Sequence, residues 1–200
     1  TLEALIYTSS CSVYGNRLVA KETDPPDPLT FYSVSKLTGE YYCQNFYQYN
    51  QLPVIILRIN NTYGPGRTLS DDYTDVITKF INAAYRGDPM RLINEGNWIR
   101  SFCYITDTVE GIINATTTGR AGQIYNIGSD RGIIGTALVE LVKVHYPQVD
   151  VQRIPPRAID EIQYRTVSGE KAKRELGWKP TISIEEGIAR IVFSLDMAIA

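Results

Sequence analysis

The chain has 200 residues, of which 44% are hydrophobic and 21% charged, and its formal net charge is −2. These values are typical of a globular protein with a buried core, and they offer neither a basic face for nucleic acid nor a lysine- and arginine-rich run for an anionic membrane. Apolar stretches such as 54–57 are too short to span a bilayer, and the single histidine, His145, excludes a multi-histidine metal site.

Apolar strands and amphipathic helices alternate along the chain. The first strand covers 4–9, a long helix covers 32–51, and a second strand covers 54–59 before a Gly/Pro loop. The elements expected after this loop are a helix at 73–86, strands at 91–94 and 102–105, a helix at 107–117, a strand at 123–127, a helix at 136–146, an extended segment at 149–154 and two terminal helices. Short buried strands separated by helices predict parallel βα units in a layered α/β fold.

The glycine cluster at 128–135 has the wrong spacing for a dinucleotide-binding fingerprint, since three residues separate its first two glycines. We interpret it as a flexible loop between a strand and a helix. In a doubly wound sheet the phosphate-binding glycine loop follows the first strand, and none follows the strand at 4–9. We therefore expect roughly 100 upstream residues to be missing, and we expect these 200 residues alone not to catalyse.

Tyr32 and Lys36 stand four residues apart, which places a phenol and an ammonium group on one face of the predicted helix. A free phenol is a poor base at neutral pH, but a nearby cation favours the phenolate. Ser10 follows the first strand, at the sheet edge where such folds bind ligands, and its hydroxyl could hold a substrate oxygen. Taken alone, the Tyr32–Lys36 pair is weak evidence, because an ordinary surface pair has the same spacing.

Motifs along the whole chain resemble the NAD-dependent epimerase/dehydratase family of extended short-chain dehydrogenases/reductases. They lie at 8–15, 27–36, 57–66, 100–107, 125–128, 176–180 and 185–188. The resemblance implies the C-terminal part of a Rossmann-like, doubly wound parallel sheet plus a smaller α/β substrate-binding lobe. It assigns 1–66, with returning segments near 101–130, to the NAD-binding domain, and 67–200 mainly to the substrate-binding lobe.

The resemblance also implies roles for individual residues. The catalytic set is Ser10, Tyr32 and Lys36; the cofactor contacts are Tyr32, Lys36 and Asn60; the substrate contacts are Ser10, Asn61, Arg100, Arg157 and Asp160. The forked donors of Arg100 and Arg157 suit a diphosphate, whereas the alternative for each arginine is a surface salt bridge. The implied cofactor is NAD, with NADP as the alternative, and no metal is expected.

Cys11 and Ser12 occupy the two positions after Ser10. Dehydratases of the family carry Asp-Glu there, and decarboxylases carry a glutamate at the second position. The resemblance therefore implies epimerisation of a nucleoside-diphosphate sugar, by oxidation and re-reduction at C4 with Tyr32 as base. The alternatives are a nucleotide-sugar 4,6-dehydratase or related reductase, and a non-catalytic nucleotide-sugar sensor.

Two expectations concern the surroundings of the protein. The family implies a homodimer packed through the helices at 32–51 and 73–86. Three widely spaced cysteines indicate reduced thiols in a cytoplasmic protein, and Cys11 is expected to be a packed, inert thiol.

Overall fold

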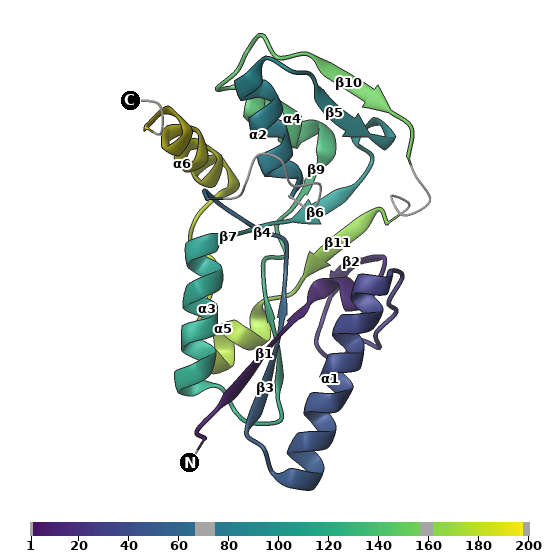
Figure 1. The fold of residues 1–200 in the computed structure, drawn as a ribbon, viewed down its shortest axis with the longest axis vertical. Helices are drawn as coiled ribbons and strands as arrows, with labels where there is room; N and C mark the ends of the chain where they lie inside the picture. Colours follow the sequence, from purple (N-terminus) through teal and green to yellow (C-terminus); the bar gives the residue numbers. More distant parts are fainter. Residues whose placement is uncertain (1, 67–74, 157–161, 198–200) are drawn as a thin grey trace.

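A computed structural model of the chain describes residues 2–66, 75–156 and 162–197, which form two packed regions joined by a small sheet (Figure 1). The lower region, called the sheet region below, contains parallel strands in the order β1-β3-β8. Its elements are β1 (Leu5–Ser10), β3 (Val54–Ile59), β8 (Ile124–Ile127), α1 (Phe31–Asn50), α3 (Ile105–Thr118) and α5 (Glu170–Leu176). The predicted α/β class with a Rossmann-like parallel sheet is confirmed.

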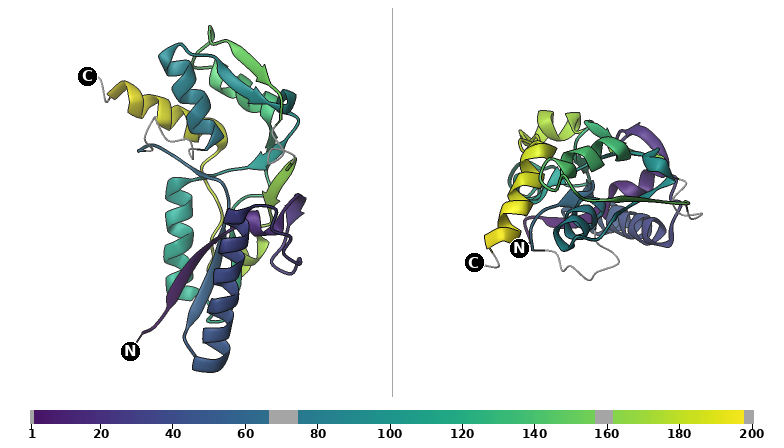
Figure 2. Two further views of the ribbon diagram at one scale, coloured as in Figure 1. Left: turned by 45° about the vertical axis from the view of Figure 1, so that its right-hand side comes forward. Right: turned by 90° about the horizontal axis from the view of Figure 1, so that it is seen from above.

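Side chains of β3 alternate between the two faces of this sheet. Val54 and Ile56 pack with Cys43 of α1, whereas Ile55 and Leu57 pack in a cluster with side chains of α3 and α5. Figures 1 and 2 show α1 and α3 on opposite sides of the sheet. Because helices cover both faces, β3 is apolar at nearly every position.

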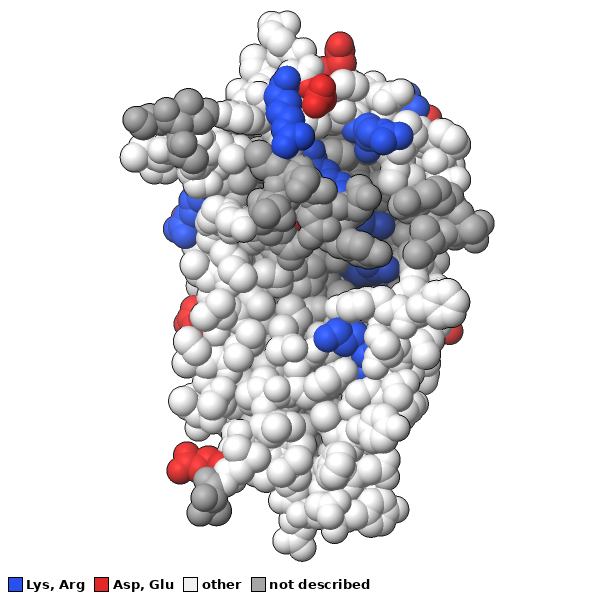
Figure 3. All heavy atoms as spheres, viewed as in Figure 1, with Lys and Arg blue, Asp and Glu red and all other residues white. Residues whose placement is uncertain are grey.

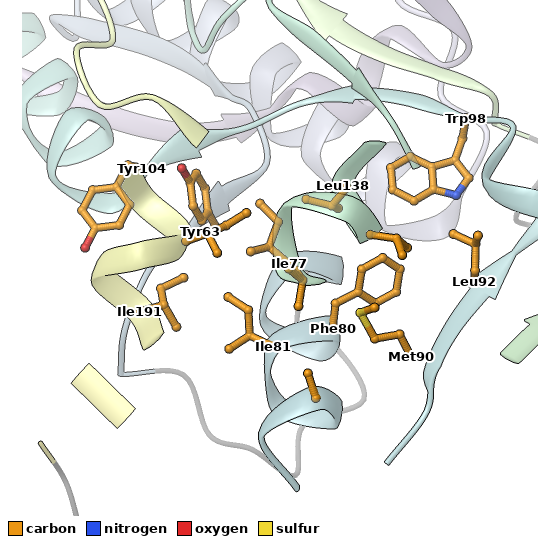
Figure 4. Close-up of a cluster of buried hydrophobic side chains, with 14 residues drawn as sticks. Tyr63, Ile77, Phe80, Ile81, Met90, Leu92, Trp98, Tyr104, Leu138 and Ile191 are labelled. Atoms are coloured by element: carbon orange, nitrogen blue, oxygen red, sulfur yellow. The ribbon is translucent and has the colours of Figure 1, made fainter. Parts of the chain in front are cut away.

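The upper region, called the apolar lobe below, packs helices against the parallel pair β10-β5. Its elements are α2 (Val76–Arg86), α4 (Gly135–Lys143), α6 (Ile184–Met197), β5 (Met90–Ile93) and β10 (Val151–Ile154). Figure 4 shows its core, in which Phe80 and Ile81 of α2 lie among Met90, Leu138 and Ile191. The short parallel pair of β4 (Thr62–Tyr63) and β7 (Cys103–Tyr104) adds two aromatic rings to this core.

A four-stranded sheet in the order β2-β11-β6-β9 lies between the two regions (Figure 1). Its strands are β2 (Arg17–Ala20), β11 (Tyr164–Val167), β6 (Ile99–Ser101) and β9 (Gly132–Ile134). The prediction of a loop throughout 128–135 is wrong, because Gly132–Ile134 pairs with β6 as an antiparallel strand. The strand expected at 102–105 is present as the shorter β7, Cys103–Tyr104, between the end of β6 at Ser101 and the start of α3 at Ile105.

The helix α2 lies in the apolar lobe, away from α1 (Figure 1). Its apolar residues Ile77, Phe80 and Ile81 are buried in the core of the lobe. These side chains are therefore unavailable to extend the exposed surface of α1, and the structure does not bring the two helices of the predicted dimer contact together within one chain.

The described ranges contain no helix long and apolar enough to cross a membrane. They also contain no group of three or more His, Cys, Asp or Glu residues arranged to hold a metal ion. Cys11, Cys43 and Cys103 are buried and form no disulfide.

Candidate active site

The helix α1 begins directly before Tyr32 because Thr30 caps it. The Thr30 hydroxyl accepts a hydrogen bond from the Ser33 backbone N–H at 3.1 Å, and the Ser33 hydroxyl accepts one from the Thr30 backbone N–H at 2.9 Å. This reciprocal capping box fixes the first turn of the helix. Tyr32 and Lys36 therefore project from one face of α1, at the end that lies beside the carboxyl end of β1 (Figure 1).

Lys36 is held between the sheet and the phenol of Tyr32. Its Nζ donates a hydrogen bond to the backbone carbonyl of Thr8 at 2.8 Å and lies 5.8 Å from the centroid of the Tyr32 ring. The Tyr7 hydroxyl donates to the Lys36 carbonyl at 3.2 Å, which joins β1 to the same turn of the helix. Since an ammonium group has three donors and Thr8 takes one, Lys36 keeps donors for a ligand.

Ser10 and Tyr32 present their hydroxyls at this same end of β1. Ser10 is half-buried, and its Oγ accepts a hydrogen bond from the Ser12 backbone N–H at 3.2 Å, which leaves its own proton to be donated. Tyr32 is 56% exposed, and within residues 2–66, 75–156 and 162–197 no protein group hydrogen-bonds its hydroxyl. Lys36 and Tyr32 are thus neighbours, and Ser10 lies at the end of β1, two residues after the Thr8 carbonyl that Lys36 binds.

A buried ion pair lies behind this set, and the sequence analysis missed it. Glu40 of α1 and Arg58 of β3 are 1% and 3% exposed, and the guanidinium binds the carboxylate through Nε at 2.9 Å and Nη2 at 2.6 Å. Ser9 donates to the same carboxylate, so the pair ties α1 to both β1 and β3. The available signal was Arg58 itself, because a charge within an apolar strand needs a buried partner.

Asn60 is 2% exposed, and both the oxygen and the nitrogen of its carboxamide form hydrogen bonds. Its Oδ1 accepts from the Cys11 thiol at 2.9 Å and from Asn61 Nδ2 at 3.1 Å, while its Nδ2 donates to the Ser101 hydroxyl. Asn61 Nδ2 also donates to the Ser101 carbonyl at 2.8 Å. These bonds join the ends of β1 and β3 to β6. Contact of Asn60 with a cofactor, and of Asn61 with a substrate, stays a prediction.

The Cys11 thiol beside Ser10 is 3% exposed. Burial raises its pKa to about 11, although the charges of Arg165 and Arg100 oppose the rise. A thiol with so high a pKa is protonated at neutral pH and is a poor nucleophile. This agrees with the packed thiol expected from the sequence.

Arg100 lies on β6, half-buried, with its guanidinium carbon 5.0 Å from the centroid of the Trp98 ring. Arg157 and Asp160, the other two residues predicted to bind phosphate and ribose, lie outside the described residues. Figure 3 shows Lys and Arg side chains spread over the upper half of one face of the molecule, while the acidic side chains lie mainly toward its edges. The face is therefore suited to an anionic ligand.

Comparisons with known proteins agree with these features. A sequence model of the NAD dependent epimerase/dehydratase family matches residues 1–128. The chain is 32% identical over 202 residues to dTDP-D-glucose 4,6-dehydratase of Mus musculus, and 31% identical over 192 residues to UDP-glucuronic acid decarboxylase 6 of Arabidopsis thaliana. These alignments cover 96% and 92% of this chain and 55% of each relative, so the chain spans about half the length of the curated relatives it matches.

A similar solved structure is that of UDP-glucose 4-epimerase with UDP-glucose from Thermotoga maritima. It superposes with a TM-score of 0.92 at 28% sequence identity. The superposition covers 100% of this chain and 65% of the Thermotoga chain.

Proposed function

The chain belongs to the NAD dependent epimerase/dehydratase family, and on this basis we propose that the full-length protein epimerises a nucleoside-diphosphate sugar at C4. The observation that carries the proposal is that Lys36 lies beside Tyr32 and binds β1 two residues before Ser10, while the two positions after Ser10 carry no carboxylate. Cys11 and Ser12, both buried, occupy those positions. A site without an acid there favours oxidation and re-reduction over the removal of water from the sugar.

NAD, when bound, supplies a reversible acceptor for the hydride of the sugar C4. The described residues fit the nicotinamide end of this cofactor. Lys36 presents ammonium donors suited to ribose hydroxyls, at the sheet edge where doubly wound folds bind nucleotides, and the exposed Tyr32 hydroxyl lies beside it. The choice of NADP in place of NAD is the alternative.

In the proposed reaction, Tyr32 takes the proton of the C4 hydroxyl while that carbon is oxidised, and returns it when the carbon is reduced on its other face. Ser10 donates a hydrogen bond to the same oxygen and keeps it in line with the phenol. The charge of Lys36, 5.8 Å from the ring centroid, stabilises the negative charge that develops on the phenol oxygen. Inversion at C4 requires the oxidised sugar to turn within the site.

The nucleotide part of the substrate is proposed to lie toward β6. Arg100 would bind the diphosphate through forked donors, with Asn61 close to the sugar nucleotide. Arg157 and Asp160 complete this proposed set from outside the described residues. We also propose that the sheet region belongs to the NAD-binding domain and the apolar lobe to the substrate-binding lobe; α5 packs in the sheet region although it lies within 67–200.

The test is to incubate the full-length protein with UDP-glucose and NAD and to measure UDP-galactose. Its formation is the expected result. The 32% identity to the mouse 4,6-dehydratase favours a second candidate, which would instead give a product that has lost one water. Binding of UDP-glucose without any product, together with no product from a nucleotide sugar that carries a carboxylate, would indicate a sensor and contradict both enzymes.

We further propose a homodimer in which α1 supplies the contact. Tyr42, Phe46 and Tyr49 follow an i, i+4, i+7 spacing and are 65%, 50% and 73% exposed. An aromatic stripe of this kind is typical of an interaction surface. Light scattering of the full-length protein at micromolar concentration should give the mass of a dimer, and a monomer would contradict the proposal.

A further inference from the structure

Three arginines occupy neighbouring positions on adjacent strands of the four-stranded sheet. Arg165 of β11 is the register partner of both Arg17 of β2 and Arg100 of β6. Side chains at paired positions of adjacent strands project from the same face, and the strands lie about 4.8 Å apart. The three arginine side chains therefore leave one face of the sheet at adjacent positions, called the arginine row below.

The arginine row faces the turn that follows Ser10. Val167, at the end of the strand that carries Arg165, packs with Cys11 and Val13 of this turn, and the charges of Arg165 and Arg100 act on the buried Cys11 thiol. Arg17 lies on the edge strand β2, and its Nη2 contacts the Pro25 carbonyl at 3.5 Å, in the segment that leads to α1. The row thus runs from the neighbourhood of the catalytic helix toward β6.

Within the described part of the chain, no carboxylate forms an ion pair with Arg17 or Arg165. The Nε atoms of both side chains are buried without a hydrogen-bond partner. Burial of a charged donor without a partner is unfavourable, and neighbouring like charges repel. Where an arginine of this chain is buried for structure, as at Arg58, the chain supplies the carboxylate of Glu40. The arginine row therefore has the character of a site for an external anion.

We propose that Arg17 and Arg165 form a second anion subsite beside Arg100, and that this subsite binds a carboxylate on the sugar of the nucleotide sugar. The inference rests on the proposed function, in which Arg100 binds the diphosphate. The order of the row fits such a ligand, because its sugar would lie toward Ser10 and Tyr32 and its nucleotide toward β6. A guanidinium fork matches a carboxylate with two parallel hydrogen bonds, whereas a neutral hexose would leave Arg17 without a counter-charge.

The test measures the affinity of UDP, UDP-glucose and UDP-glucuronate for the full-length protein by calorimetry. We expect UDP-glucuronate to bind at least ~10-fold more tightly than UDP-glucose, the scale of a hydrogen bond to a charged group. The double variant Arg17→Gln/Arg165→Gln should lose this preference while its affinity for UDP and UDP-glucose changes less than about threefold. Arg86→Gln, at an exposed position ending α2, removes the same charge elsewhere and should leave the preference unchanged.

Three results would overturn the subsite. Equal affinity of the wild-type protein for UDP-glucose and UDP-glucuronate would do so while leaving the proposed function intact. An equal loss of UDP affinity in the double variant would mean that the row binds only the diphosphate. Failure of the wild-type protein to bind any of the three nucleotides would contradict the proposed function as well. If the double variant does not fold, the single Arg17→Gln variant, on an edge strand, decides between these outcomes.

Discussion

In the sheet region α1 meets the sheet through Glu40 and Arg58, whereas in the apolar lobe α2 meets its neighbours through side chains such as Ile77 and Ile81 (Figure 4). Hydrogen bonds depend on distance and angle, while apolar contacts depend mainly on the area removed from water. The directional bonds lie where Tyr32 and Lys36 must be placed against β1. The apolar contacts lie in a region to which we assign no catalytic residue. We infer that placement and bulk stability are supplied by different regions.

Of the substitutions that test this comparison, removal of Glu40 should change the free energy of unfolding most. The Glu40→Ala substitution leaves Arg58 as an unpaired buried charge, and we expect the free energy of unfolding to fall by about 3–5 kcal/mol. Urea unfolding of the full-length protein measures this loss.

The matched control replaces both partners. Glu40→Leu with Arg58→Met leaves no buried charge, so most of the lost stability should return. If Glu40→Ala alone costs less than about 1 kcal/mol, as an exposed pair would, the ion pair does not hold α1 on the sheet.

The Tyr32→Phe substitution should leave the fold intact and remove the proposed acid–base group. We expect turnover of the full-length enzyme to fall at least ~100-fold, equivalent to about 2.7 kcal/mol. The dissociation constant of the nucleotide sugar should barely change. Tyr41→Phe on the same helix, 52% exposed, is the control and should keep normal turnover. Near-normal turnover in Tyr32→Phe would refute the assignment of the base.

A smaller effect is expected in the apolar lobe. Ile81 is fully buried, and Ile81→Val should lower the free energy of unfolding by about 0.5–1.5 kcal/mol without changing turnover per folded molecule. Ile113→Val, at a position 56% exposed on α3, should have a still smaller effect on stability. A clear loss of turnover in Ile81→Val would show that the apolar lobe also positions the catalytic residues.

The smallest expected effect is at Cys11. Burial raises its pKa to about 11, so the thiol is protonated at pH 8 and its thiolate fraction grows only as the pH approaches that value. Iodoacetamide at pH 8 should leave Cys11 unlabelled in the native protein and label it fully in urea, as read by mass spectrometry. Rapid labelling of the native protein would show that the turn after Ser10 opens.

Elements that depend on local pattern could be predicted from the sequence. The apolar run at 54–59 and the helical spacing of apolar residues at 32–51 can each be recognised within a short stretch of sequence. The structure has β3 and α1 at these positions. The strands β2 and β11 were missed because each is only four residues long and carries an arginine. They become strands by pairing with each other from distant parts of the chain, and no local pattern reports such a pairing.

The candidate site shows the same limit. Ser10, Tyr32 and Lys36 were found because they lie in two short motifs, at 8–15 and 27–36, that can be read directly from the sequence. Glu40 was not, because charged residues on helices usually face solvent, although its place one turn after Lys36 puts it on the side that meets the sheet. The pairing of Arg17 with Arg165 could not be predicted either, because it depends on the register between two strands that are distant in the sequence.

The topology of the four-stranded sheet should affect the rate at which the chain folds. Its strands come from early, middle and late parts of the sequence, and such non-local pairings form slowly because long loops must close first. Three like charges in one row oppose the final closure. Refolding in the presence and absence of UDP measures whether an anion speeds this step. A ligand that binds only the closed sheet shifts the equilibrium toward it, and we therefore expect the substrate to stabilise the closed sheet whether or not it speeds closure.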